Sequence, residues 1–448
     1  MTTAEVAASS VDPILPGLGD YLSARQAIRS RHRAEYHAVL EEAAGLYRGV
    51  RPFCTVVQET IHRLEERSAD GIDPYYSTSI AQWVGAVRRG LKWVESGADP
   101  AFLKYYADAE AFLTDVESEF PNTSRRRRAV PFVGFWVQPA DTVAQSARLR
   151  ERVTDCLPEF PGHSYAVLDD KAVHSVAGHF DRAVGALRCW DPTAYEAVVT
   201  GLTTAFVALH KDEKVSLGTR ADCFGTLIAG LSPERLASDN VAATASQLYH
   251  EACHLKLALY LEVEQPALGA DPVFVSPFKN ETRDLETMLH TAYTLSIECL
   301  TRLALASEER DARWERSLAY LAAVAARLEL VGEIAELGLG KDHPAPLRRI
   351  PILASEAVRA VRRKLASVSA TSRALHEQER IAVRARHTWD IGQFLVRGVQ
   401  VIDPGLQGTV RVTSETVAFR YDGRPVTASR EAPKPSIGDY GRYIEAVL

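Results

Sequence analysis

A long helical stretch that carries two histidines constrains this chain more than any other feature. Residues 247–260 read QLYHEACHLKLALY, and the helix formers around them contain no proline or glycine for about 25 residues. Within it, His250, Glu251 and His254 form an HExxH motif. Histidines four positions apart lie about one turn apart on the same helix face, so both imidazoles can reach one divalent metal ion. A buried His–Glu hydrogen-bonded pair is the alternative.

The length and composition indicate a globular protein. The chain has 448 residues, enough for one large or two ordinary domains. Its content of 46% hydrophobic and 25% charged residues is typical of a soluble protein. The net charge of −6 argues against a general nucleic-acid binder, so we expect no nucleic-acid partner. The one basic cluster, at 124–128, is predicted to be a solvated loop, with contact to an acidic peptide as the lesser alternative.

Neither a membrane span nor a secretory signal is expected. No stretch reaches 18 uninterrupted apolar residues, and the N-terminal sequence MTTAEVAASSVDP lacks a basic start followed by an apolar block. The six cysteines show no CxxC spacing, which fits a reducing cytoplasm and excludes a CxxxCxxC iron–sulfur site. We therefore expect a cytoplasmic protein without a membrane partner.

The hydrophobic pattern predicts an α+β fold that is mainly helical, with the HExxH helix packed beside a small β-sheet. Residues 1–18 are expected to be a flexible tail, and 19–128 a helical region in which apolar residues recur every three or four positions. Residues 129–393 form the predicted catalytic region, and 394–448 a short β-rich C-terminal segment. We see no convincing linker between these parts, which favours one integrated body.

Short strands are expected directly before the motif helix, an order shared by many metallohydrolases. The predicted strands in the catalytic region are 129–137, 164–169, 206–210, 214–218 and 224–230. Residues 282–369 are almost wholly helical, with an interruption at 338–346. In the C-terminal segment, 394–403 and the alternating pattern of 408–428 predict a hairpin or meander.

A catalytic metal usually has three protein ligands, so a third ligand must be sought outside HExxH. The metzincin extension requires Gly and His three and six residues beyond His254, where this chain has Leu257 and Tyr260. That pattern is excluded. A gluzincin-type site would take a glutamate from a second helix, and Glu281 or Glu286 fits this role, with Glu298 a weaker choice.

His290 is another candidate for the third ligand. If 283–304 is one helix, Arg283, Glu286, His290, Tyr293 and Ile297 share one stripe, opposite an apolar packing face. A histidine on the same side as Arg283 can bind a metal while the arginine holds a carboxylate beside it, because the planar guanidinium pairs bidentately with carboxylates. The alternative is a polar face turned to solvent.

The segment YHEACH followed by VSPFKNETRDLETMLHTAY resembles the HExxH-type peptide β-hydroxylases, which use 2-oxoglutarate and iron to modify ribosomally made peptides. The similar elements are the HEAxH helix, the SPF segment at Ser276–Lys279, Arg283–Asp284, and the LH-aromatic helix at Leu289–Tyr293. The resemblance covers roughly residues 215–300. Two positions depart from the family pattern, since Lys279 replaces an Arg and Asp284 replaces a Pro.

The resemblance implies iron bound by His250, His254 and His290, with Arg283 as the partner of a 2-oxoglutarate carboxylate. Lys279 is expected in the same co-substrate pocket. It keeps the charge of the family's arginine but cannot bind a carboxylate in a bidentate manner. Fe(II), 2-oxoglutarate and O2 are then the expected cofactors and co-substrates. The expected activity is hydroxylation at the β-carbon of a residue in a peptide or amino-acid-derived substrate.

Three functions follow from the same motif. In the oxygenase, Glu251 orients a ligand or a water. In a zinc metallopeptidase, zinc is held by His250, His254 and a glutamate (Glu281 or Glu286), Glu251 is the general base, and Tyr293 or His290 stabilises the oxyanion. A peptide-binding scaffold without activity is the third. We take the oxygenase as the leading hypothesis, with Glu251 and Tyr293 as its catalytic candidates.

Overall fold

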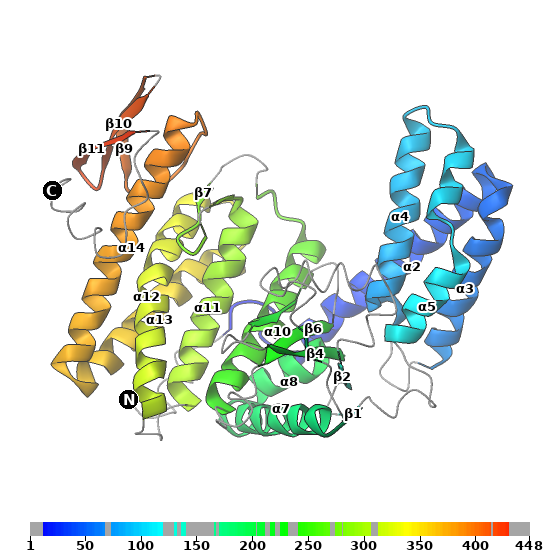
Figure 1. Cartoon of the computed structure of the whole chain (residues 1–448), viewed down its shortest axis with the longest axis horizontal. Helices are drawn as coiled ribbons and strands as arrows, with labels where there is room; N and C mark the ends of the chain where they lie inside the picture. Colours follow the sequence, from blue (N-terminus) through cyan, green and yellow to red (C-terminus); the bar gives the residue numbers. More distant parts are fainter. Residues whose placement is uncertain are drawn as a thin grey trace. The chain divides into compact units, whose positions relative to one another are not determined.

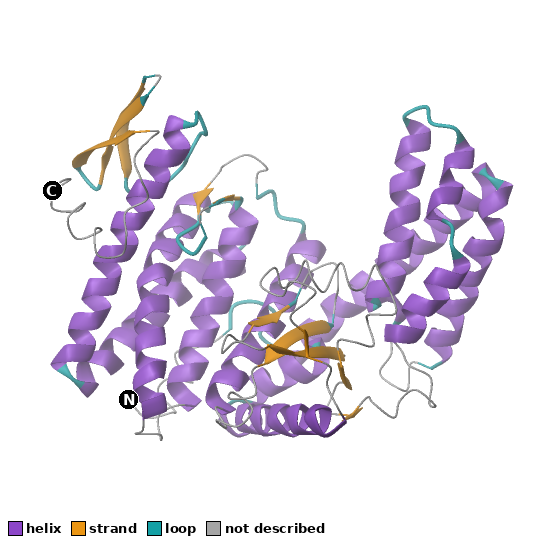
Figure 2. Ribbon diagram, in the orientation of Figure 1, coloured by secondary structure: helices purple, strands orange, loops and turns teal. Residues whose placement is uncertain are grey.

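The structure is a computed structural model in which long helices predominate over short β-strands (Figures 1 and 2). The described residues are 12–67, 73–119, 130–131, 136–139, 165–166, 170–202, 204–210, 216–219, 225–231, 241–268, 274–279, 281–305, 312–413 and 415–429. The chain divides into two compact units. The N-terminal unit is Leu15–Glu264, and the C-terminal unit comprises Gln265–Leu448 together with Met1–Ile14.

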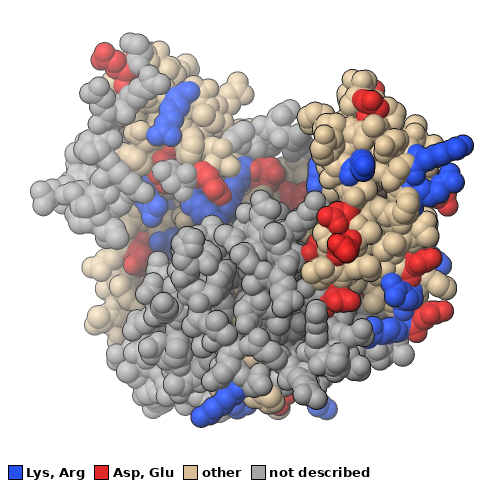
Figure 3. All heavy atoms as spheres, turned by 45° about the vertical axis from the view of Figure 1, so that its right-hand side comes forward, with Lys and Arg blue, Asp and Glu red and all other residues tan. Residues whose placement is uncertain are grey.

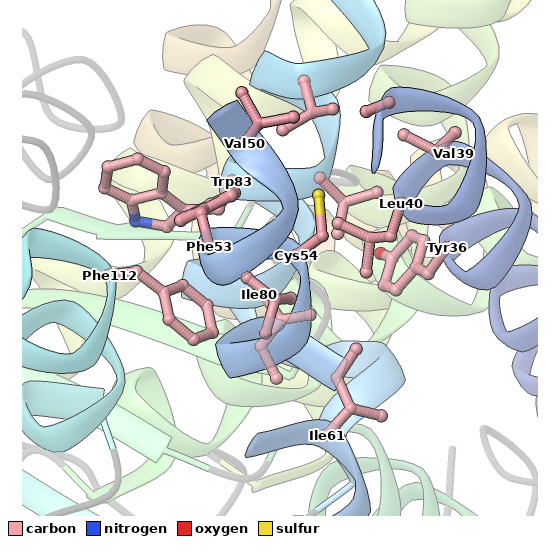
Figure 4. Packing of buried hydrophobic residues seen from close by; sticks show 14 of the residues in the cluster. Tyr36, Val39, Leu40, Val50, Phe53, Cys54, Ile61, Ile80, Trp83 and Phe112 are labelled. Atoms are coloured by element: carbon pink, nitrogen blue, oxygen red, sulfur yellow. The ribbon is translucent and has the colours of Figure 1, made fainter. Parts of the chain in front are cut away.

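The first part of the N-terminal unit consists of helices. These are α2 (Leu18–Leu46), η1 (Arg48–Val50), α3 (Arg51–Glu66), η3 (Pro74–Tyr76), α4 (Thr78–Glu95), η4 (Pro100–Tyr106) and α5 (Ala109–Glu119). The Ser77 hydroxyl accepts a hydrogen bond from the Ile80 amide and so begins α4 with an N-cap. The helices bury a common core in which Trp83 packs edge-on against Phe112 and tilted against Phe53 (Figure 4).

Among the described residues, a six-stranded sheet and three helices form the rest of the N-terminal unit. They are β1 (Val130–Pro131), β2 (Trp136–Pro139), β3 (Tyr165–Ala166), α7 (Asp170–Trp190), α8 (Pro192–Gly201), β4 (Thr204–His210), β5 (Ser216–Gly218), β6 (Thr226–Leu231) and α10 (Val241–Glu264). The main strand order is β1-β2-β4-β6-β5, and β3 also pairs with β4. Strand β4 is parallel to β2 and β6, whereas β5 is antiparallel to β6.

Helix α10, which carries HExxH, is buried along almost its whole length. It packs against α2, α7, α8 and β5. A helix with buried residues on every face is a central element of its fold, as the apolar sequence on both sides of the motif requires. The fully buried His179 of α7 is hydrogen-bonded to Thr244 of α10 at 2.8 Å and fixes these two helices together. The predicted motif helix beside a small sheet is therefore confirmed.

In its described part, the C-terminal unit is a bundle of long helices with two small antiparallel sheets. Its elements are β7 (Phe274–Val275), β8 (Thr282–Arg283), α11 (Leu285–Leu305), α12 (Ala312–Gly338), α13 (Ala345–Val368), α14 (Ala370–Val396), β9 (Leu406–Val412), β10 (Thr416–Tyr421) and β11 (Arg424–Ser429). Helix α12 packs against α11, α13 and α14. The sheet β9–β11 packs on α14, where a Cβ at Gly392 would lie 2.6 Å from that of Ala428. The mainly helical α+β class is thus confirmed.

Three predicted boundaries differ from the structure. Residues 394–403 are not a strand, because α14 continues to Val396 and the chain then turns at Gly398, whose φ is +78°. Ile391, Leu395 and Val396 are buried in the core beneath the sheet, so the apolar run belongs to the helix. The β-rich part begins only at Leu406.

The second and third differences concern the N-terminal segment and the helix after the motif. Within the predicted flexible tail 1–18, Asp12 and Ile14 are buried, at 7% and 0% exposure. The predicted helix 283–304 begins at Leu285, since Arg283 belongs to strand β8 and the Asp284 carboxylate caps the helix by accepting from the Thr287 amide at 2.8 Å.

The division at Glu264 falls inside the predicted region 129–393. One integrated body stays a prediction.

The basic run 124–128 and residues 1–11 lie outside the described residues. Where Figure 3 shows described residues, Lys and Arg side chains are interspersed with Asp and Glu. Among the described helices, none is both long and apolar enough to cross a bilayer.

Candidate metal centre

The two motif histidines converge at their ring nitrogens. Nε2 of His250 lies 3.1 Å from Nε2 of His254, and the rings meet edge to face with centroids 4.9 Å apart. Both side chains are partly buried on α10. The helical spacing of four residues produces this convergence, because each side chain leaves the same face one turn from the other.

The nitrogen separation fits two ligands of one metal ion. With metal–nitrogen bonds of about 2.0–2.1 Å, a separation of 3.1 Å corresponds to a nitrogen–metal–nitrogen angle of about 95–100°. That angle lies between the octahedral and tetrahedral values, so the pair suits either iron or zinc. The donor set of two imidazoles is also one that both metals accept. The residues therefore fit a metal ion.

Glu251 is held beside the pair by a residue from the sheet. Its carboxylate accepts a hydrogen bond of 2.7 Å from the Thr219 hydroxyl, directly after β5. The other carboxylate oxygen lies 4.0 Å from Nε2 of His250. With a side-chain exposure of 8%, this carboxylate needs a fixed partner, and Thr219 provides one. Thr219 was missed from the sequence, where its only signal is its place after the predicted strand 214–218.

Arg283 and Glu281 form an ion pair with each other on the second arm of the β7–β8 hairpin. Nε of Arg283 donates to the Glu281 carboxylate at 2.6 Å, and a second guanidinium nitrogen also reaches it. The hairpin is closed by a 3.0 Å bond from the Ser276 amide to the Glu281 carbonyl, and the Ser276 hydroxyl accepts from the amides of Phe278 and Lys279. The Lys279 residue is exposed. The two predicted co-substrate residues thus lie on one hairpin.

His290 lies on α11 of the C-terminal unit, whereas the HExxH pair belongs to the N-terminal unit. Burial lowers the pKa of His290 to about 4, and the Asp284 carboxylate opposes this shift. The imidazole is therefore neutral at pH 7, the state in which histidine binds metals. Glu286, the alternative ligand on the same helix, is exposed, and partial desolvation followed by repulsion from Asp284 raises its pKa.

Tyr293 has a partner in the N-terminal segment. Its side chain is fully buried, and its hydroxyl donates a 2.6 Å hydrogen bond to Asp12. The same Asp12 oxygen accepts from the Ile14 amide at 2.9 Å. This network attaches residues 12–14 to α11, a role that the sequence did not indicate. The predicted catalytic role of Tyr293 stays a prediction beside this structural one.

Glu298, the weakest candidate ligand, belongs to a different cluster. It accepts a 2.7 Å hydrogen bond from the Tyr320 hydroxyl and lies 3.6 Å from the Arg302 guanidinium. That guanidinium also covers the Tyr320 ring, with its carbon 4.1 Å from the ring centroid. These contacts give the buried Glu298 carboxylate the hydrogen bond and the opposite charge that it requires in the middle of α11.

Among the residues that the structure describes, no three His, Cys, Asp or Glu side chains are grouped so as to hold a metal ion. Within the N-terminal unit, the site consists of two converging imidazoles and an oriented carboxylate. No model of a known protein family matches the chain, and no curated protein matches it. These comparisons therefore identify no third ligand.

Proposed function

We propose that this protein is an Fe(II)- and 2-oxoglutarate-dependent oxygenase that hydroxylates the β-carbon of a residue in a peptide or peptide-like substrate. The observation that carries the metal part of the proposal is the 3.1 Å convergence of the His250 and His254 nitrogens. The choice of an oxygenase rests on the similarity of residues 215–300 to the HExxH-type peptide β-hydroxylases.

In this proposal His250, His254 and His290 hold the iron, and Arg283 and Lys279 receive the carboxylates of the keto acid. When bound, the iron with 2-oxoglutarate and O2 supplies the oxidising power to hydroxylate a C–H bond, with release of succinate and CO2. The low pKa of His290 supports its part, because no proton has to be displaced from this ring at neutral pH.

Glu251 and Arg283 have distinct tasks in the proposed reaction. Glu251, held by Thr219, orients a water or a neighbouring ligand through its second oxygen. Arg283 must exchange Glu281 for the carboxylate of the co-substrate. Because Glu281 is exposed, breaking this ion pair costs little, and the guanidinium can pair with a keto acid in the same bidentate manner.

Succinate release tests the proposal. The protein, loaded anaerobically with Fe(II) and then given 2-oxoglutarate and O2, is expected to form succinate, and His254→Ala is expected to form none. Arg283→Ala is expected to weaken 2-oxoglutarate affinity while the iron content stays intact. Loss of iron with unchanged keto-acid affinity would show that the role assigned to Arg283 is wrong.

A zinc metallopeptidase is the second candidate, and the placement of Glu251 favours it. One Glu251 oxygen lies 4.0 Å from Nε2 of His250 and the other is held by the Thr219 hydroxyl, and in this candidate the carboxylate acts as the general base on a zinc-bound water. In this case Glu281 or Glu286 would be the third ligand. Cleavage of a peptide with zinc and without keto acid would favour this candidate over the oxygenase.

A further inference from the structure

A cavity of about 650 Å³ lies in the C-terminal unit where α13 ends and α14 begins. Four of the residues that line it are arginines, and only one is acidic. The lining residues are Arg362, Arg363, Leu365, Ala366, Ala370, Arg373, Ala374, His376, Glu377 and Arg380. This volume lies within the range of small-molecule sites, but the lining is far more basic than is usual for them.

A buried histidine fixes the first arginine of the cavity. His376 is 5% exposed, and its Nδ1 donates to the carbonyl of Ala322 at 3.2 Å. Its Nε2 therefore accepts from Nε of Arg362 at 3.0 Å, which requires a neutral ring. Burial lowers the pKa of His376, in agreement with a neutral ring. Arg362 is further held by Glu329 through its Nη2 at 2.6 Å, so its orientation is set before any ligand binds.

The second arginine is fixed by carboxylates. Arg380 makes two hydrogen bonds to Glu377, at 2.7 and 3.1 Å, and lies 3.9 Å from Glu329. Glu329 thus lies between Arg362 and Arg380 and partly neutralises both. These two arginines form an ordered wall of the cavity with little excess charge.

The excess positive charge comes from Arg363 and Arg373. Both are exposed, and among the described residues neither guanidinium group has a hydrogen-bond or ion-pair partner. Arg373 and Ala370 belong to the first turn of α14, a helix of 27 residues whose N-terminus adds a positive partial charge to the same space. Two uncompensated guanidinium groups and a helix N-terminus thus face one cavity with two prearranged arginines.

We propose that this cavity binds a small molecule that carries two or more phosphoryl groups. Guanidinium groups bind phosphate oxygens in a bidentate manner, and a helix N-terminus favours an anion. Arginines contributed by both α13 and α14 suit a ligand with more than one charged group. The site is independent of the HExxH motif and lies on elements that the proposed oxygenase reaction does not use.

Inorganic tripolyphosphate tests the site when titrated calorimetrically into the full-length protein at constant ionic strength. We expect saturable binding at one site per chain. Arg363→Gln with Arg373→Gln is expected to weaken binding by about tenfold or more. The matched control, Arg349→Gln with Arg359→Gln, removes the same charge from α13 outside the cavity and is expected to bind as the wild type does.

Three further arms separate the alternatives. Ala366→Glu adds a negative charge to the lining without removing an arginine, and it too is expected to weaken binding. His250→Ala with His254→Ala is expected to bind normally, which excludes the metal motif as the phosphate site. Citrate is expected to bind about tenfold more weakly than tripolyphosphate, because its carboxylates present fewer acceptor oxygens.

The proposal is overturned if the wild type shows no saturable binding, or if the control pair weakens binding as much as the cavity pair. Equal affinity for citrate overturns the phosphoryl assignment. Circular dichroism checks whether each variant is folded. If the variant with both arginines replaced does not fold, Ala366→Glu still tests the site.

Discussion

The two ring nitrogens of HExxH are the most informative atoms of the molecule, because their separation follows directly from the sequence. A spacing of four residues on an uninterrupted helix predicts that His250 and His254 share a face, and their Nε2 atoms lie 3.1 Å apart. The hydrogen-bond partner of Glu251, in contrast, could not be predicted from the spacing of residues in the sequence. Thr219 is 32 residues away in sequence and reaches Glu251 only because β5 packs against α10.

The first prediction concerns this pair. His254→Ala is expected to reduce the affinity for Fe(II) or Zn(II) by about a hundredfold or more, since loss of a group that only orients a metal ligand already costs about 10–100-fold. Metal content after dialysis measures it. The control is His174→Ala on α7, which is exposed and should retain the metal content of the wild type. Equal metal content in all three proteins would contradict a site at HExxH.

The second prediction separates the two tasks of Glu251. Glu251→Gln preserves an oxygen that can accept from Thr219 and removes the charge. For the oxygenase we expect iron content near that of the wild type and succinate formation within about tenfold, because an orienting group is partly replaced by an amide. For a peptidase, loss of the general base lowers the cleavage rate by about 10²–10⁴-fold. A loss of that size in succinate formation would show that Glu251 is more than an orienting group.

At the scale of elements, the connection between the N-terminal segment and α11 was not visible in the sequence. Residues 1–18 are small, polar and interrupted by proline, which is typical of a loose tail, yet Asp12 and Ile14 are buried. The reason is a contact across 281 positions, from Tyr293 to Asp12. Local patterns predict helices and strands but do not reveal a partner at such a distance.

The third prediction tests this connection. Tyr293→Phe is expected to lower the free energy of unfolding by about 1–3 kcal/mol, because a buried carboxylate loses a donor. Urea unfolding measures the change. Tyr105→Phe, at a tyrosine that is 78% exposed, is the matched control and should change stability little. If Tyr293→Phe unfolds like the wild type but forms no succinate, the hydroxyl acts in catalysis rather than in packing.

The fourth prediction concerns pH and the junction of α2 with α10. His32 stacks on Tyr36 and is bonded to the Tyr75 carbonyl and to Glu262, each at 3.1 Å. Burial lowers the pKa of His32, but the bonds to Glu262 and Tyr75 outweigh burial, and the net pKa lies above 6.5. A raised pKa in the folded state stabilises the protein below the unfolded value of 6.5, and this stability is lost as the pH rises through the folded pKa.

Urea unfolding at about pH 6 and pH 8.5 checks this pH dependence. Over that interval the free energy of unfolding of the wild type is expected to fall by up to about 1 kcal/mol more than that of His32→Gln. The effect is small because Glu262 is partly exposed. His62→Gln is the control, since that histidine is 72% exposed beside Glu66. An identical pH dependence in wild type and His32→Gln would show that the His32–Glu262 contact is not populated in solution.

At the scale of the whole molecule, the sequence predicted the class and most elements but not the division into units. Periodicity placed the long helices and the short strands before the motif because each is a local pattern. Residues 394–403 were predicted to be a strand, since Phe394–Val396 fits a strand as well as a helix, whereas packing makes these three residues the end of α14. The boundary at Glu264 has no composition signal, and it separates the HExxH helix from the helix of His290.

The central claim is that HExxH serves an iron site that also takes 2-oxoglutarate. The most direct measurement is the anaerobic visible spectrum of the protein with Fe(II) and 2-oxoglutarate. We predict a weak charge-transfer band that requires both additions, that disappears in His254→Ala, and that needs more keto acid in Arg283→Ala. An unchanged spectrum in the wild type, together with peptide cleavage that depends on zinc alone, would contradict the oxygenase.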